Sequence, residues 1–164
     1  MAINKIAIIY HSESGNTKMM ANLIAKGARG GGCEVKTMPV NELELSFIEA
    51  SRAVLFGSPT YYGTMSWQMK KMMDTTLPDL SGKLGAVFAS AGWQGGGGYE
   101  VTEMSLIVGM LIKGMLIYSG GVRVGHPPTH FGAVSAGLPK DFDAERCIKL
   151  GANIAAKVNE LWPR

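Results

Sequence analysis

The sequence is poor in the residues that build metal centres, disulfide frameworks and highly charged surfaces. Its two cysteines, Cys33 and Cys147, lie far apart and form no C-x-x-C pair. We therefore expect two buried thiols and no zinc site, redox pair or disulfide. Only 18% of the residues are charged, the net charge is +3, and the lysines and arginines are scattered. A nucleic-acid-binding protein needs a basic stripe or cluster, so nucleic acid is not an expected partner.

Long hydrophobic runs and nucleotide-binding fingerprints are missing as well. The longest apolar stretch, residues 106–118, is interrupted by Gly109, Lys113 and Gly114 and is too short to span a bilayer. The N-terminus has no signal-peptide layout, so we expect a cytoplasmic protein. No G-x-G-x-x-G follows a strand, and Gly82-Lys83 does not meet the P-loop spacing, which disfavours the ATP and dinucleotide folds of those types.

Short apolar runs alternate with segments of helical periodicity along the chain. At 164 residues and 46% hydrophobic composition, the chain is expected to form one domain over residues 1–164. The alternation predicts an α/β fold with a parallel sheet and helices on both faces. The predicted strands are Lys5–Tyr10, Glu34–Met38, Ala53–Gly57, Leu84–Ala89 and Met115–Tyr118. The predicted helices start near Thr17, follow the stripe Met65 to Leu77, and cover about Glu100–Lys113 and Asp143–Trp162.

Three polar or glycine-rich segments follow the first, third and fourth predicted strands. In open α/β sheets, ligands bind beyond the carboxyl ends of the strands. The first segment is Ser12, Glu13, Ser14, Gly15, Asn16 and Thr17. The second begins at Ser58 and continues with Pro59, Thr60, Tyr61, Tyr62, Gly63 and Thr64. The third is Ser90, Ala91, Gly92, Trp93, Gln94, Gly95, Gly96 and Gly97, followed by Gly98.

The compositions of these loops complement one another. The first offers hydroxyls, backbone amides and a helix N-terminus, which together suit a phosphate, although Ser14 or Asn16 as a plain helix cap explains it equally well. The second carries two adjacent aromatic residues, and the third lets backbone approach a ring edge closely. A phosphate at one end and a flat ring at the other describe a mononucleotide such as FMN, and we predict all three loops to be cofactor-binding.

The motif Ser12-x-Ser14-Gly15-Asn16-Thr17 resembles the phosphate loop of the flavodoxin-like family. Residues 57–70, together with 82–90 and 130–133, resemble a narrower branch, the tryptophan-repressor-binding-protein-like NAD(P)H:quinone oxidoreductases. The resemblance covers nearly the whole chain. It implies a flavodoxin-like, doubly wound, five-stranded sheet of order 2-1-3-4-5 with FMN at the switch point.

The resemblance also implies catalytic candidates and partners. Lys113 takes the place of a histidine that the branch often has near the flavin, and His130 lies in a matching segment, so both are predicted to be catalytic. The implied partners are a small acceptor such as a quinone and NAD(P)H, in a homo-oligomer. The apolar segment Met104–Ile112 is either core or subunit contact.

Two main functions remain open at this point. One is an FMN-dependent oxidoreductase that reduces quinones or similar acceptors with NAD(P)H; here the cofactor supplies the chemistry. The alternative is a flavodoxin-type single-electron carrier, and a weaker third is an FMN module of a larger complex. Carriers of this family tend to be strongly acidic, whereas this chain has a pI of about 8.9. That difference favours the enzyme.

Overall fold

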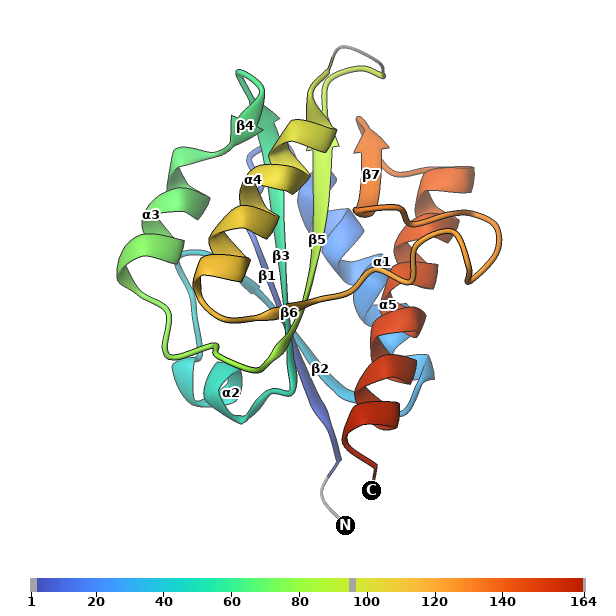
Figure 1. The fold of residues 1–164 in the computed structure, drawn as a ribbon. Helices are drawn as coiled ribbons and strands as arrows, with labels where there is room; N and C mark the ends of the chain where they lie inside the picture. Colours follow the sequence, from blue (N-terminus) through green and yellow to red (C-terminus); the bar gives the residue numbers. More distant parts are fainter. Residues whose placement is uncertain (1–2, 95–96, 164) are drawn as a thin grey trace.

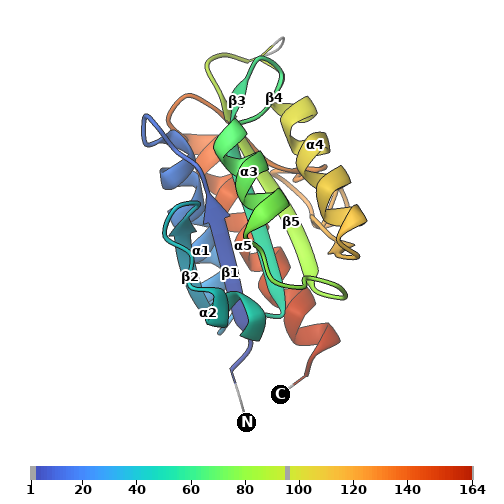
Figure 2. The ribbon, with the colours of Figure 1, turned by 90° about the vertical axis from the view of Figure 1, so that its left-hand side faces the viewer.

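A central sheet lies between two layers of helices in the computed structural model, which describes residues 3–94 and 97–163 (Figures 1 and 2). The first half of the chain forms β1 (Lys5–Tyr10), α1 (Asn16–Gly30), β2 (Glu34–Pro39), α2 (Leu45–Ala50), β3 (Ala53–Tyr61) and β4 (Thr64–Met65). The second half forms α3 (Trp67–Thr75), β5 (Leu84–Ala91), α4 (Tyr99–Ile112), β6 (Leu116–Ile117), β7 (Gly132–Ala136) and α5 (Asp141–Leu161). None of the helices in the described ranges is long and apolar enough to cross a membrane.

The sheet has the order β2-β1-β3-β5-β6, and the strands along this path are parallel. This confirms the predicted doubly wound α/β fold. The central strands are nearly continuous apolar runs because helices cover both faces, α1 and α5 on one side and α2, α3 and α4 on the other. From β1 the chain goes to β2 on one side and then crosses to β3, so the switch point lies between the carboxyl ends of β1 and β3.

Two short strands share the fifth position of the sheet. β6 pairs with the start of β5 at Leu84–Gly85, and β7 pairs with Val87–Ala91. The predicted strand Met115–Tyr118 is thus only two residues long, and residues 118–131 form an insertion before β7. The sequence prediction lacks β7 because its residues, Gly-Ala-Val-Ser-Ala, include no run of large apolar side chains.

Helix α1 is held against α5 by two glycines. A Cβ on Gly27 would lie 1.9 Å from the carbonyl oxygen of Ile148, and one on Gly151 would lie 1.9 Å from that of Ile24. Only glycine permits so close a helix crossing. Cys147 is buried in this layer, and burial raises the pKa of its thiol to about 12. The tight packing fixes the N-terminus of α1 at the carboxyl edge of the sheet.

Candidate functional site

The three predicted ligand loops gather at the carboxyl ends of β1, β3 and β5, three neighbouring strands (Figure 1). Pro59 lies opposite Ser90 in the β3–β5 register, so the second and third loops start side by side. The Thr17 and Ser90 hydroxyls share a buried hydrogen bond of 2.9 Å, which joins the first loop to the third. Gly95 and Gly96 lie outside the described residues.

The first loop forms a candidate anion-binding site from the backbone N–H groups of Ser14, Asn16 and Thr17, which we call the anion seat. Gly15 precedes α1 in the left-handed region (φ 94°), a conformation that favours glycine. The Ser12 hydroxyl oxygen accepts from the backbone N–H of Gly15 at 3.2 Å and of Lys18 at 3.3 Å. Within residues 3–94 and 97–163, the backbone N–H groups of Ser14, Asn16 and Thr17 have no hydrogen-bond partner. Unpaired donors at a helix N-terminus attract an anion, because the helix dipole adds positive charge there.

The one carboxylate in this loop, that of Glu13, is held by two side chains outside the loop. Glu13 Oε1 accepts from His11 Nε2 at 3.0 Å and from Gln68 Nε2 at 3.3 Å. His11 Nδ1 lies 2.9 Å from the hydroxyl of Ser66, the N-cap of α3. With Nε2 protonated toward Glu13, Nδ1 accepts from Ser66. The Glu13 side chain thus ties the first loop to α3, and Glu13 also lines a cavity of about 570 Å³ together with Ser12 and Ser14.

The second loop is a β-hairpin with an exposed aromatic tip. Tyr62 and Gly63 connect β3 to β4 with φ values of 50° and 76°. A two-residue turn with two positive φ values fits the right-handed twist of a hairpin, but it is strained for tyrosine. Tyr62 is fully exposed and Tyr61 is 38% exposed. Partial burial, followed by the charge of Glu13, raises the pKa of Tyr61. Thr102 donates to Thr60 at 3.0 Å and fastens the hairpin to α4.

The third loop bends back on itself beside the hairpin. A Cβ on Gly97 would lie 2.2 Å from the carbonyl oxygen of Trp93, and one on Gly98 would lie 3.2 Å from the Gly63 Cα. The Trp93 indole is 73% exposed although it stands next to the end of a buried strand. Two exposed aromatic side chains, on Tyr62 and Trp93, therefore lie on the loops that follow the neighbouring strands β3 and β5, where they could contact a planar ligand.

The structure does not bring Lys113 or His130 to these loops. Helix α4 runs antiparallel to β5, so its C-cap Lys113 lies at the amino edge of the sheet, where Gly82 donates to the carbonyl of Gly114. This corrects the predicted catalytic role of Lys113, because the three predicted ligand loops are at the opposite edge. His130 lies in the insertion before β7, and its carbonyl accepts from Ser119.

His130 borders a separate polar cavity of about 220 Å³. The cavity also holds Glu103, which is 2% exposed, and Arg146; Glu103 Oε1 and Arg146 Nε are buried and have no hydrogen-bond partner within the described chain. Burial, followed by the charge of Glu100, raises the Glu103 pKa well above its ordinary value of 4.5, against the opposing effect of Arg146.

We expect Glu103→Gln to remove a pH dependence of stability. A raised folded-state pKa contributes stability that is present below the unfolded pKa and is lost as the pH rises through the folded pKa. The free energy of unfolding should therefore fall by up to about 1.4 kcal/mol per pH unit above the ordinary pKa of Glu103. Urea unfolding should be measured between about pH 5 and 8. The free energy of unfolding of Glu103→Gln should rise relative to that of the wild type as the pH increases. Glu145→Gln, at an exposed site on α5, is the control. A difference between Glu103→Gln and wild type that stays constant with pH would contradict the raised pKa of Glu103.

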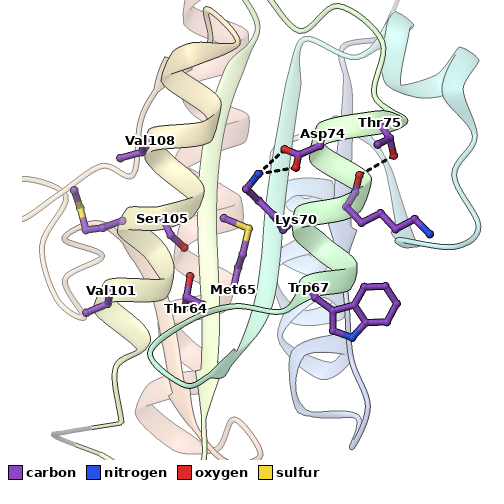
Figure 3. A pocket seen from close by; sticks show the side chains of 11 residues that line it. Thr64, Met65, Trp67, Lys70, Asp74, Thr75, Val101, Ser105 and Val108 are labelled. Atoms are coloured by element: carbon purple, nitrogen blue, oxygen red, sulfur yellow. Dashed lines mark hydrogen bonds and ion pairs between the residues drawn. The ribbon is translucent and has the colours of Figure 1, made fainter.

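One cavity lies beside the ligand loops rather than among them. It has a volume of about 860 Å³ and opens between α3 and α4. Figure 3 shows Thr64 and Ser105 on its α4 side and the ion pair of Lys70 with Asp74, 2.6 Å long, on its α3 side. Its walls are mainly apolar. This cavity and a second one of about 480 Å³, lined by Ile112 and Lys113, form a continuous groove along α4.

Sequence reasoning missed the residues that connect the loops. His11, Ser58 and Ser66 form a buried polar chain under the hairpin, in which Ser58 Oγ accepts from the Ser66 N–H at 2.9 Å. Thr102 on α4 also supports the hairpin, through its hydrogen bond to Thr60. The available signal is His11 itself, a polar residue that follows a buried strand directly. Its partner Ser66 is 55 residues away, a pairing that no local pattern reveals.

Comparisons with known proteins agree on one family. The family model described as flavodoxin matches residues 8–105. A flavodoxin of Clostridium saccharobutylicum is 39% identical over 160 residues, covering 96% of this chain and 99% of that protein. An NAD(P)H dehydrogenase (quinone) of Archaeoglobus fulgidus is 35% identical over 195 residues, covering 96% of this chain and 98% of that protein. The solved structure of a flavodoxin from the domain Archaea has a TM-score of 0.78 and 31% identity, covering 94% of this chain and 99% of the other.

Proposed function

This chain belongs to the flavodoxin family of FMN-binding electron-transfer proteins and oxidoreductases, and we propose that it reduces quinones or similar small acceptors with NAD(P)H. The observation that carries FMN binding is the anion seat of the first loop, where three unpaired amides meet the N-terminus of α1 at the switch point of the sheet. When bound, FMN supplies the capacity to accept and pass on electrons.

The residues of the three loops fit both the phosphate and the ring of FMN. The amides of Ser14, Asn16 and Thr17, with the neighbouring hydroxyls, would hold the phosphate by neutral donors. Tyr62 and Trp93 would border the ring. His11 and Ser66 act through the loops, since they hold the first loop against the hairpin and His11 binds the Glu13 carboxylate. The Thr17–Ser90 bond fixes the separation of the first and third loops.

The net charge supports the enzyme over the carrier. At +3 the chain repels basic protein partners, whereas it attracts NAD(P)H, which is anionic. The Archaeoglobus relative is named as an enzyme that uses NAD(P)H and quinone. A quinone is small and apolar, and the exposed rings of Tyr62 and Trp93 offer apolar contact next to the cofactor.

One observation favours the second candidate, a single-electron carrier. The alignment with the Clostridium flavodoxin runs over 160 residues and covers both chains almost completely. The alignment with the Archaeoglobus enzyme needs 195 positions to cover 96% of this 164-residue chain, so that enzyme has insertions that this chain lacks.

Anaerobic titration of the FMN-loaded protein separates the two functions. We expect NADH or NADPH to bleach the visible flavin spectrum, and a benzoquinone then to restore it over many turnovers. The redox titration should give one two-electron transition. A protein that NAD(P)H leaves oxidised, and that titrates in two well-separated one-electron steps, would be a carrier. The FMN assignment survives either outcome, since the visible spectrum is its own readout.

Two further parts of the proposal concern location and assembly. A cytoplasmic location remains a prediction. The predicted homo-oligomer is supported by apolar residues that α4 leaves exposed, among them Val108 and Ile112.

A further inference from the structure

The polar cavity between α4, β7 and α5 holds two buried polar atoms that lack a hydrogen-bond partner within residues 3–94 and 97–163. They are Oε1 of Glu103, a residue that is 2% exposed, and Nε of Arg146. A Cβ on Gly132 would lie 2.6 Å from Glu103 Oε1, so the carboxyl group lies close to the backbone of β7 where glycine leaves room. Buried polar atoms in native proteins nearly always have a partner, so these two atoms point to an occupant of the cavity. We call it the Glu103 cavity.

The size and the walls of the Glu103 cavity indicate a small ligand that carries a ring. Its volume of about 220 Å³ is below the roughly 300 Å³ at which pockets for drug-sized ligands begin. Tyr99, Pro128, Phe131 and Val134 are among its lining residues. A buried water needs several polar partners, which apolar walls do not offer, so a cluster of waters fits this cavity poorly. A single flat ring with one polar end fits it better.

The hydrogen-bonding roles of the two unpartnered atoms define the polar end of the ligand. The Nε–H of Arg146 can only donate, so the ligand must present an acceptor to it. Glu103 keeps an accepting oxygen in either protonation state, so the ligand must also present a donor. A carboxylate has no donor and an ammonium has no acceptor. A primary amide presents both, side by side on one planar group.

The charges around the Glu103 cavity favour a neutral ligand. Asp143 lies 3.7 Å from Nη1 of Arg146 and already balances part of its charge. An anionic ligand would meet the carboxyl groups of Glu100 and Glu103, which both line the cavity. A cationic ligand would be buried beside the guanidinium of Arg146. A neutral amide avoids both like-charge contacts.

We propose that the Glu103 cavity binds a small, neutral aromatic amide, whose carbonyl accepts from Arg146 Nε and whose N–H donates to Glu103. The site is separate from the three ligand loops. Gly132 lies opposite Val87 in the β5–β7 register, whereas β5 continues to Ala91 before the third loop turns back. The proposal rests neither on FMN binding nor on the proposed reaction, because none of its residues belongs to those loops.

Three probes with the same ring separate the possible ligand chemistries. Benzamide, benzoate and benzylamine present an amide, an anion and a cation, and calorimetric titration of each into the FMN-loaded protein measures its affinity. We expect benzamide to bind with a dissociation constant of about 1 mM or below, as is reasonable for about nine non-hydrogen atoms. Benzoate and benzylamine should bind at least about 10-fold more weakly, because each leaves one buried polar atom unpaired.

Two variants place the binding in the Glu103 cavity. Glu103→Met and Arg146→Met each remove one of the two polar atoms, and each should weaken benzamide binding at least about 10-fold. Glu49→Met makes the same change at an exposed site on α2 that does not line the cavity, and it should bind benzamide like wild type. FMN affinity should stay unchanged in all three variants, which shows that they fold and separates this proposal from the cofactor assignment.

A measurement on the wild type completes the test without any variant. In protein labelled with ¹³C at the glutamate carboxyl carbons, benzamide should shift the Glu103 resonance and leave that of Glu49 in place. A wild type that does not bind benzamide, or that binds benzoate as tightly, would overturn the proposal. Benzamide binding that persists in both Glu103→Met and Arg146→Met would also overturn it, since the amide would then lie elsewhere, for example against the exposed ring of Trp93.

Discussion

Replacing Ser14 with alanine should weaken FMN binding by about 10- to 150-fold and leave riboflavin binding nearly unchanged. The estimate follows from about 1.5–3 kcal/mol for a hydrogen bond to a charged group, converted at about 1.4 kcal/mol per factor of ten. Ser14 stands in the anion seat and makes no side-chain hydrogen bond within the described residues, so its loss should disturb only the phosphate. Riboflavin has the same ring and no phosphate.

The measurement is titration of the apoprotein with each flavin, followed by flavin fluorescence. Ser81→Ala is the matched control, because Ser81 is an exposed serine at the opposite, amino edge of the sheet. Equal losses of FMN and riboflavin affinity in Ser14→Ala would show that Ser14 shapes the loop rather than contacting phosphate.

Replacing both Tyr62 and Trp93 with alanine should weaken the binding of FMN and of riboflavin to the same extent. Stacking of a flat heterocycle on an aromatic side chain is worth about 1–3 kcal/mol. The double alanine variant should therefore lose at least about 10-fold in affinity for FMN and for riboflavin alike. The folded state should keep its stability, because both side chains are exposed and support no core contact.

Trp162→Ala is the control for this second experiment, since it removes an indole at the far end of α5. Loss of FMN affinity with riboflavin affinity intact would contradict the ring assignment. Together, the two experiments divide the binding free energy between the phosphate end and the ring end of the site.

The sequence was sufficient for the parts of the fold that follow local periodicity. β1 has the predicted bounds, and α1, α4 and α5 begin and end within two residues of the prediction, because long apolar periods specify them. The loops follow from the fold, since ligand loops lie at the carboxyl ends of strands.

The sequence misleads where position depends on chain direction or on distant contacts. Lys113 ends a helix that returns to the amino edge, so its place next to the fifth strand puts it far from the flavin loops. The insertion 118–131 splits the fifth position of the sheet, and only β-pairing with β5 reveals that Gly132–Ala136 completes it. The His11–Ser66 contact depends in the same way on packing across the sheet edge.

The most direct test of the account is reconstitution of the apoprotein with FMN, with the bound flavin counted per chain from the visible spectrum and the released cofactor identified by chromatography. We predict one FMN per chain, bound without a covalent link, and no FAD. The affinity for FMN should exceed that for riboflavin, because the seat formed by Ser14, Asn16 and Thr17 adds the phosphate contacts. A protein that takes up no FMN, or that binds riboflavin as tightly as FMN, would contradict the central claim.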